Sequence, residues 1–446
     1  MSNPISRRAF TASAAALGAL ATTARAADSD RKIRMGFVGL GNRGDQVLSA
    51  FLPQPDAEIV ALCDVYEPYA LAAQSKAGGK PRIYRDYREL LAQSDVDAVV
   101  IATPDHWHAL QFIDACRAGK DVYVEKPLSL TIAEGQRMVE VAEETKRVTL
   151  MGTQRRSSPL IQEMVRLIQD GAIGKVSVAK CYHLVNESPM GIGKPADGDP
   201  PPGLDWDFWL GPAPQVAFNT NRCLYKFRWF WNYSGGQLTN MGTHYLDLIQ
   251  WALGQDAPTS VVASGGNYVV QDNREIPDTM EVVWEYPGGT LVTFSQYNGN
   301  AAASNPRDCD LEFRGSEGTL YYRQNSIEIV PERVRTQELA AQSPIAREAN
   351  RKQGESRQLA RKEFRQQGAI GDELHARNFL DCVKSRQPTN CPVAVGHRST
   401  SVTLLGNIAY KTGRKIRWDA ARQECLDDAA ANALLTYEYR APWRLS

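Results

Sequence analysis

The chain has 446 residues, which is enough for two domains. Its composition is that of an ordinary globular protein, with 43% hydrophobic and 23% charged residues. The 51 basic and 51 acidic side chains cancel, which argues against a nucleic-acid partner or an anionic membrane surface and favours small uncharged or polyol substrates over polyanions.

Residues 1–27 have the pattern of a twin-arginine export signal. Arg7 and Arg8 are followed by an uncharged Ala/Leu-rich run, and Ala24-Arg25-Ala26 offers a cleavage site. The alternative is a disordered basic N-terminus, but three separate features coincide here. The apolar run is too short to span a membrane, and no later segment is apolar enough to do so. We therefore expect an exported, periplasmic protein without an integral membrane segment after cleavage.

The first structural motif is an apolar strand over residues 33–38 that runs into a Gly-x-Gly-x-x-Gly turn and a helix from about Asp45. This order of strand, glycine turn and helix is the dinucleotide-binding fingerprint. Gly39 permits the tight turn, Gly41 lets the backbone approach a pyrophosphate, and Gly44 lets helix and strand pack closely. The residues between these glycines are also expected to contact the cofactor: Leu40, Asn42 and Arg43.

The fingerprint requires an acidic residue about 20 positions further on, at the end of the second strand. Asp64 stands where the apolar run of residues 58–63 stops. A carboxylate at this place accepts both ribose hydroxyls of NAD and repels the 2′-phosphate of NADP. The alternative is a loop aspartate that simply ends a strand. The spacing therefore favours NAD over NADP.

The rest of the first domain alternates between strands and helices, which predicts a parallel sheet wound on both faces, an α/β Rossmann domain over residues 32–152. Further strands are expected at residues 83–87, 96–102, 122–125 and 148–151, with helices at 69–77, 87–94, 108–118 and 132–146.

The alternation ends near Gly152, and residues 153–446 are predicted to form a second, α+β domain with a mostly antiparallel sheet. Its helices are expected at 160–169, 372–385 and 397–412, and its strands at 174–182, 260–268, 280–286, 290–296, 309–314 and 318–323. Residues 186–204 form a long loop of the kind that often covers a binding site. Residues 333–367 are interpreted as a solvated excursion with some helix, and the last segment packs back.

Three groups of polar residues are candidates for chemistry. Residues 103–108 follow the fourth strand and Glu125-Lys126-Pro127 follows the fifth, so both turns face a ligand at the carboxyl edge of the sheet. Asn240, His244 and Asp247 have helical spacing and share one helix face. We expect Thr103, Pro104, His108 and Glu125 to contact the cofactor. His106 and His108 could chelate a metal, but no other ligand completes the site, and no metal is expected.

The glycine turn, the Glu125-Lys126-Pro127 segment and the run Gly236-Gln-Leu-Thr-Asn-Met-Gly-Thr-His244 together resemble the glucose–fructose oxidoreductase and inositol dehydrogenase (Gfo/Idh/MocA) family. The resemblance covers nearly all of the mature chain. It implies a C-terminal domain with a large open sheet that houses substrate and often mediates oligomerisation, here as a dimer or tetramer. It also implies hydride transfer between a sugar or polyol carbon and a nicotinamide.

In this resemblance, Lys126 matches the active-site lysine and His244 the catalytic histidine. The family commonly has aspartate where this chain has Asn240; an aspartate would stabilise the Lys/His pair by its charge, whereas an amide can only hydrogen-bond. Oxidation of an alcohol needs a base, and both histidine and a desolvated lysine can serve. The structural alternatives are a surface salt-bridge lysine and a helix-packing histidine.

Candidate substrate contacts are less specific: Arg155, Tyr182, Trp229, Thr243 and Asp247. Surface exposure is the alternative for Arg155. Aromatic side chains crowd the segment before His244, and one or two of them could form a platform for a sugar ring: Trp206, Phe208, Trp209, Tyr225, Phe227, Trp229, Phe230, Trp231 and Tyr233.

The sequence thus favours an oxidoreductase that transfers hydride between a sugar, polyol or glycoside and a tightly held nicotinamide. One alternative is a glycoside-cleaving enzyme that works by transient oxidation with bound NAD. Another is a non-catalytic NAD-binding sensor or scaffold, which would need neither Lys126 nor His244. Eight cysteines contain no Cys-x-x-Cys pair, and the spacing leaves open whether Cys382 and Cys391 pair.

Overall fold

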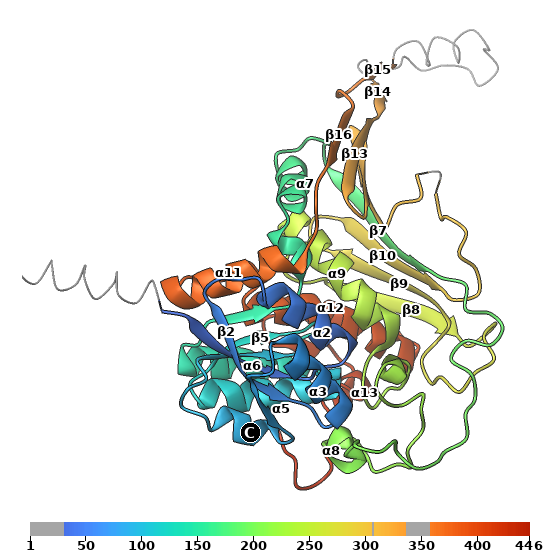
Figure 1. Ribbon diagram of the computed structural model, residues 1–446. Helices are drawn as coiled ribbons and strands as arrows, with labels where there is room; N and C mark the ends of the chain where they lie inside the picture. Colours follow the sequence, from blue (N-terminus) through green and yellow to red (C-terminus); the bar gives the residue numbers. More distant parts are fainter. Residues whose placement is uncertain (1–30, 306, 336–356) are drawn as a thin grey trace, which may run out of the picture.

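The computed structural model describes residues 31–305, 307–335 and 357–446. Two sheets dominate it: a parallel sheet near the N-terminus, and a large mixed sheet formed mainly by the second half of the chain (Figure 1). The predicted export signal lies outside the described residues. No helix of the described chain is long and apolar enough to cross a membrane.

The first sheet is parallel throughout and has the order β3-β2-β1-β4-β5-β6. Its strands are β1 (Ile33–Val38), β2 (Ala57–Cys63), β3 (Arg82–Tyr84), β4 (Ala98–Ile101), β5 (Asp121–Val124) and β6 (Thr149–Met151). The central strands are buried along almost their whole length, as their continuous apolar runs predict. The strand order reverses between β1 and β4, and that reversal opens a crevice at their carboxyl ends. The predicted Rossmann fold is confirmed.

Helices cover both faces of this sheet: α2 (Asn42–Phe51), α3 (Glu67–Lys76), α4 (Tyr87–Leu91), α5 (Asp105–Arg117) and α6 (Ile132–Thr145). Local sequence explains where α6 begins. The Thr131 side chain accepts a hydrogen bond from the Glu134 backbone, and the Glu134 carboxylate accepts one from the Thr131 backbone. This capping box satisfies two N–H groups that a helix start otherwise leaves unpaired.

The second sheet has ten strands in the order β16-β13-β12-β11-β7-β10-β9-β8-β17-β18. These are β7 (Val176–Leu184), β8 (Ser260–Gly266), β9 (Thr279–Tyr286), β10 (Thr290–Tyr297), β11 (Leu311–Gly315), β12 (Gly318–Arg323), β13 (Ser326–Pro331), β16 (Phe364–Gln367), β17 (Ile416–Asp419) and β18 (Glu424–Cys425). Every pairing is antiparallel except that of β7 with β10. The mostly antiparallel second sheet is therefore also confirmed.

Part of the segment expected to be a solvated excursion is sheet instead. The strand β16 extends the large sheet by pairing with β13, and β14 (Arg333–Arg335) pairs with β15 (Arg357–Leu359). In β16, Arg365 and Gln367 are exposed, because this is an edge strand with polar side chains facing water. Such a strand lacks the alternation of apolar and polar residues by which a strand is predicted from sequence. The helix predicted within this segment lies outside the described residues.

The helices of the second half are α7 (Pro159–Gln169), α8 (Trp206–Leu210), α9 (Gly236–Leu253), α11 (Asp372–Ser385), α12 (Val393–Thr412) and α13 (Ala429–Ala433), with the 3-10 turns η1 (Gln154–Ser157) and η2 (Lys226–Trp229). Side chains of α7, α9 and α12 form one apolar core with the inner face of the large sheet. On the opposite face, Val262 and Leu291 are each 44% exposed.

The helix α11 joins the two halves of the molecule. It lies against α2 on the Rossmann side (Figure 1). Phe379 contacts Phe51 and Tyr123 edge-on, with ring centroids 6.3 and 6.0 Å apart. Arg377 pairs with Asp56 at 2.6 Å. A helix distant in sequence is thus part of the first core.

All eight cysteines are free and buried in the structure. The Cys382 thiol donates to the Pro388 carbonyl, and no bond to Cys391 is formed. Both thiols belong to the core that α11 shares with the Rossmann sheet. They pack as small apolar side chains.

The contact of α11 with the first core gives a test of the domain junction. We expect Phe379→Ala to lower the free energy of unfolding by about 3–5 kcal/mol, because it removes a fully buried ring that α2 and β5 cannot collapse to replace. Chemical denaturation followed by tryptophan fluorescence measures the change. On the same helix, Leu374 is 44% exposed, and Leu374→Ala is the control with an expected change within about 0.5 kcal/mol. Equal effects of the two substitutions would contradict the packing.

Candidate active site

The glycine turn after β1 is shaped by close contacts that admit no side chain. Gly39 has φ +84°, and a Cβ there would lie 2.7 Å from the Ala102 carbonyl carbon. A Cβ on Gly44 would lie 2.0 Å from the Gly39 oxygen. The helix α2 begins immediately after Gly41, so its free N–H groups point into the crevice. This is a site for a phosphate group of a ligand.

Asp64 stands at the end of β2 and fixes the same turn. Its carboxylate accepts hydrogen bonds from the backbone N–H of Leu40 at 2.6 Å and of Tyr66 at 2.8 Å. Burial raises the pKa of Asp64 to about 6, against the lowering effect of these hydrogen bonds. The carboxylate lines the crevice and, with a pKa of about 6, is mainly ionised at neutral pH.

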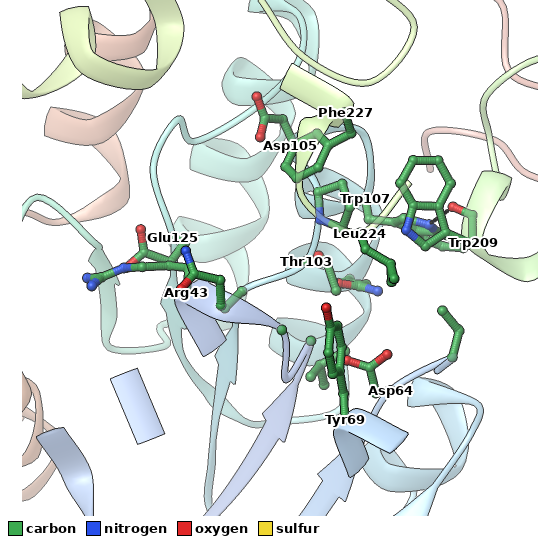
Figure 2. A pocket seen from close by; sticks show the side chains of 18 of the residues that line it. Arg43, Asp64, Tyr69, Thr103, Asp105, Trp107, Glu125, Trp209, Leu224 and Phe227 are labelled. Atoms are coloured by element: carbon green, nitrogen blue, oxygen red, sulfur yellow. Dashed lines mark hydrogen bonds and ion pairs between the residues drawn. The ribbon is translucent and has the colours of Figure 1, made fainter. Parts of the chain in front are cut away.

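The crevice continues from this turn to the second domain as one cleft of about 1140 Å³, including its open mouth. Asp64 and Tyr69 lie on one side of it, and Asp105 and Phe227 lie on the opposite side (Figure 2). Of the predicted cofactor contacts, the cleft is lined by Gly39, Gly41, Asn42, Arg43, Asp64, Thr103, Pro104, Glu125 and Lys126. Leu40 and Gly44 shape the turn behind it.

His108 connects the two turns that follow β4 and β5. Its Nδ1 lies 2.7 Å from the Pro127 carbonyl oxygen and its Nε2 lies 2.9 Å from the Thr103 carbonyl oxygen. Carbonyl oxygens only accept, so a ring nitrogen that bonds to either of them is the donor. The neighbouring His106 faces the Trp209 carbonyl at 3.1 Å. In the described chain, no three His, Cys, Asp or Glu side chains form a group that could hold a metal.

Lys126 reaches across the cleft to the second domain. Its Nζ donates to the Asn240 Oδ1 at 2.7 Å, and the Asn240 amide donates onward to Gln237 at 2.9 Å. Burial lowers the pKa of Lys126 to about 8, although Glu125 and Asp105 act in the opposite direction. A measurable fraction of the side chain is therefore the neutral amine near neutral pH, and it can take up a proton.

Arg43 is held by two carboxylates. Its Nε donates to Glu125 at 2.7 Å, and its two terminal nitrogens donate to Asp372 at 2.8 and 2.7 Å. Burial acts to lower the pKa of Arg43, but the negative charges of Glu125 and Asp372 outweigh it and raise the pKa. The side chain expected to grip a pyrophosphate thus also ties the glycine turn to the Lys126 segment and to α11.

His244 lies one helical turn after Asn240 on α9 and is buried. Its Nδ1 has no hydrogen-bond partner among the described residues. Burial, followed by the positive charges of Lys126 and Arg155, lowers the pKa of His244 well below its usual range. The imidazole is therefore neutral and a weaker base than Lys126, and like the next two residues described it does not line the cleft.

Asp247 and Thr243 share this helix but do not line the cleft. Asp247 is buried in an ion pair with Arg156 at 2.8 Å and accepts a hydrogen bond from Ser399 at 2.6 Å. The Thr243 hydroxyl donates to the Thr239 carbonyl at 2.6 Å. The contacts of both side chains are therefore within the protein.

The other predicted substrate contacts also lie outside the cleft. The Arg155 guanidinium stacks on Tyr245 at 4.7 Å, and the Tyr182 hydroxyl donates to Glu312 at 3.2 Å. Trp229 is buried under the Arg274 guanidinium at 4.0 Å. Four of the aromatic residues proposed as a sugar platform do line the cleft: Phe208, Trp209, Tyr225 and Phe227.

Several cleft residues were not among the sequence candidates. Asp105 accepts a hydrogen bond from Ser234 at 2.5 Å, so the first turn of α5 is joined to the segment before α9. Tyr69 lies beside Gly41, and Arg228 lines the wall near Asn240. Asp105 follows directly on Thr103-Pro104, which was the available signal in the sequence; Tyr69 and Arg228 belong to no motif.

Comparisons with known proteins agree with this geometry. Residues 33–153 match a family model described as an oxidoreductase family with an NAD-binding Rossmann fold. Residues 183–347 and 366–445 match the model of the C-terminal alpha/beta domain of the same family, Gfo/Idh/MocA. The two models together cover most of the chain.

Solved structures share the fold at low sequence identity. The WlbA dehydrogenase from Bordetella pertussis, in complex with NADH and UDP-GlcNAcA, is 22% identical, with a TM-score of 0.62 over 87% of this chain and 99% of that one. A levoglucosan dehydrogenase in complex with NADH and levoglucosan is 15% identical, with a TM-score of 0.62 and the same coverage.

Curated relatives match over shorter stretches. An alpha-N-acetylgalactosaminidase from Shewanella oneidensis is 35% identical over 127 residues, which is 27% of this chain and 28% of that protein. A family 109 glycosyl hydrolase from Saccharopolyspora erythraea is 33% identical over 205 residues, or 39% and 45% of the two chains. This chain thus matches less than half the length of either relative.

The hydrogen bond between Lys126 and Asn240 predicts how the lysine titrates. We expect Asn240→Asp to raise the pKa of Lys126 from about 8 by roughly one unit or more, because a carboxylate stabilises the ammonium. The labelling of Lys126 by acetic anhydride, followed by mass spectrometry as a function of pH, measures the midpoint. Only the neutral amine reacts, so the labelling curve moves to higher pH.

An exposed asparagine provides the matched control for this substitution. Asn325 lies in the turn between β12 and β13, and Asn325→Asp should leave the Lys126 midpoint unchanged. A midpoint that is the same in Asn240→Asp and the unsubstituted protein would contradict the direct contact.

Proposed function

Because the chain belongs to the Gfo/Idh/MocA family of oxidoreductases, we propose that it transfers hydride between a hydroxyl-bearing carbon of a sugar, polyol or glycoside and tightly bound NAD. The observation that carries this proposal is the position of Lys126. A desolvated amine with a pKa of about 8 lies in the cleft that begins at the glycine turn.

The residues of the first domain fit NAD. The turn excludes any Cβ at Gly39 and Gly44, which leaves the backbone and the start of α2 free to bind the diphosphate. Asp64 lies at the end of β2 beside this turn, and its carboxylate is the acceptor we propose for the adenosine ribose hydroxyls, which supports NAD in preference to NADP. When bound, NAD supplies the nicotinamide carbon that exchanges hydride with the substrate.

The chain's own part in the reaction is to hold the substrate hydroxyl and move its proton. In the oxidative direction, neutral Lys126 takes the hydroxyl proton while hydride leaves the same carbon. Asn240 accepts a hydrogen bond from Nζ and so directs the amine. His244 lies one turn of α9 beyond Asn240 and stays neutral, so it adds no positive charge behind Lys126. In the reductive direction, the Lys126 ammonium returns the proton to the oxygen.

We further propose that the protein is exported through the twin-arginine pathway and keeps its NAD through each catalytic cycle. The residues 1–27 support export, and a compartment without a free NAD pool requires a cofactor that is regenerated in place. The absorbance of reduced nicotinamide in protein purified without added cofactor, recorded as substrate is added, tests this. Protein that is purified free of nicotinamide would contradict it.

A second candidate function is the cleavage of a glycoside by transient oxidation. The similarity to family 109 glycosyl hydrolases favours it. Oxidation of a ring hydroxyl acidifies the neighbouring C–H, the aglycone is eliminated, water adds, and hydride returns, so that no net oxidation occurs. Release of the aglycone from aryl glycosides without added NAD would establish this activity in place of a simple dehydrogenase.

We also propose a homo-oligomer, a dimer or tetramer, formed through the open face of the large sheet. That face exposes the apolar side chains of Val262 and Leu291, and an uncovered apolar sheet face favours association. Light scattering coupled to size-exclusion chromatography measures the mass. Val262→Lys together with Leu291→Lys should yield monomers, and a monomeric unsubstituted protein would contradict the proposal.

The central experiment removes the amine of Lys126. We expect Lys126→Ala to lower the rate of hydride transfer by about 10²–10⁴-fold on a panel of hexoses, inositols and hexuronates, as is typical for loss of a proton-transfer group. Binding of NAD, measured by quenching of tryptophan fluorescence, should persist. Lys175 is exposed at the start of β7, and Lys175→Ala is the control. Equal rates in Lys126→Ala and the control would favour a non-catalytic NAD-binding sensor or scaffold.

A further inference from the structure

Arg228 lines the cleft opposite the glycine turn. It belongs to the short turn η2, in the segment that leads into α9. The lining of this cleft also includes Lys126, Ser234 and Asn240. Arg228 therefore borders the part of the cleft in which the reacting substrate is held.

The guanidinium of Arg228 has no partner of opposite charge in the described part of the chain. Among the described residues it donates no hydrogen bond and forms no ion pair. Its Cζ lies over the Tyr225 ring at 4.6 Å, and Tyr225 itself is 51% exposed. Stacking occupies the flat face of a guanidinium and leaves its N–H groups at the edge free to donate.

Electrostatic effects place Arg228 at the Lys126 end of the cleft. Its positive charge contributes to the lowered pKa of Lys126 and to the lowered pKa of His183, in both cases after the larger effect of burial. It also acts on Asp105, whose pKa is raised by burial.

The carboxylates at this end are already engaged. Glu125 accepts from Arg43 at 2.7 Å and from the backbone of Lys126 at 3.1 Å. Asp105 accepts from Ser234 at 2.5 Å. Among the described residues, neither carboxylate pairs with Arg228, so its N–H groups remain free to donate to a ligand.

We propose that the substrate carries a carboxylate, as in a hexuronic acid or its glycoside, and that Arg228 binds this group. The proposal rests on the hydride-transfer function given above. A guanidinium edge matches the two oxygens of a carboxylate in a planar, bidentate contact. This contact orients the ring and presents one of its hydroxyl carbons to Lys126.

A phosphate of the dinucleotide is the other anion that could meet Arg228. The diphosphate, however, belongs at the glycine turn and the start of α2, where N–H groups are free. Arg228 belongs instead to η2, in the segment that precedes α9, and lines the cleft from there. A role in binding the cofactor would weaken the affinity for NAD, which separates it experimentally from a role in binding the substrate.

The test compares acids with their neutral counterparts. Binding of D-glucuronate, D-galacturonate and their methyl glycosides to NAD-loaded protein is measured by calorimetry, beside the corresponding hexoses and hexose 6-sulfates. We expect at least one uronate to bind and to be oxidised with a higher kcat/KM than its hexose. In Arg228→Leu, this ratio of kcat/KM values should fall about 10- to 100-fold, the effect of a lost charge-assisted pair, mainly through KM.

Two further variants test whether the change in the kcat/KM ratio is specific to the guanidinium of Arg228. Arg228→Lys retains the charge without the fork and should restore part of the preference. Arg222 also stacks on an aromatic ring, Phe230, but is paired with Glu275, so Arg222→Leu should leave the ratio unchanged. General damage to the fold would lower activity on acids and hexoses alike, and the affinity for NAD reports it independently.

Three outcomes would overturn the proposal: no binding of any uronate, an unchanged ratio in Arg228→Leu, or a preference for the 6-sulfates over the uronates. Failure of the proposed function has a different signature. In that case a uronate would bind through Arg228, while no reduced nicotinamide would form and Lys126→Ala would change nothing.

Discussion

The ammonium group of Lys126 is buried where the two domains meet, and the arrangement of the site depends on the cost of that burial. A desolvated amine is less basic, so its pKa falls to about 8. The Asn240 amide oxygen, on a helix of the other domain, accepts a hydrogen bond from it at 2.7 Å. A neutral acceptor supports the ammonium less than a carboxylate would, and this keeps part of the lysine unprotonated at neutral pH. The proton chemistry thus depends on the contact between the domains.

Other contacts between the domains converge on the same place. Arg43 connects the glycine turn to Glu125, directly before the lysine, and to Asp372 at the start of α11. Asp105 and Ser234 make a second link, between α5 and the segment before α9. Since these pairs are largely withdrawn from water, each depends on its partner being in position. Movement of one domain relative to the other would therefore disturb the diphosphate site and Lys126 together.

The charges of the cleft show why net charge is a poor guide to the substrate. The chain carries equal numbers of basic and acidic residues, yet the acidic groups beside Lys126 are all occupied by protein partners. The fold is shared with dehydrogenases at 15–22% identity, so the wall formed by residues 224–228 has to be interpreted from this chain's own side chains. Arg228 in that segment is the side chain that we propose to bind the carboxylate of an acidic sugar during hydride transfer.

The sequence by itself determined the elements whose signals are local. The strand, glycine turn and helix over residues 33–51, Asp64 at the end of the second strand, and the alternation up to Met151 all follow from apolar runs and from glycines that admit no side chain. Lys126 and Asn240 were identified by motif, and the structure brings them together. The edge strand β16 and the paired strands β14 and β15 were not predicted, because their side chains are polar and their partners lie elsewhere in the chain.

Only the tertiary structure decided which side chains face the cleft. Asp247 has the helical spacing of Asn240 and His244, yet it is buried against Arg156, because a helix face extends past the site into the core. Phe379 joins the first core from more than 200 residues away, and Arg228 meets the substrate space without any motif to mark it. Periodicity and spacing are properties of one segment of the sequence. Burial, ion pairing and the desolvation of a charged group depend on the residues that folding brings next to that segment.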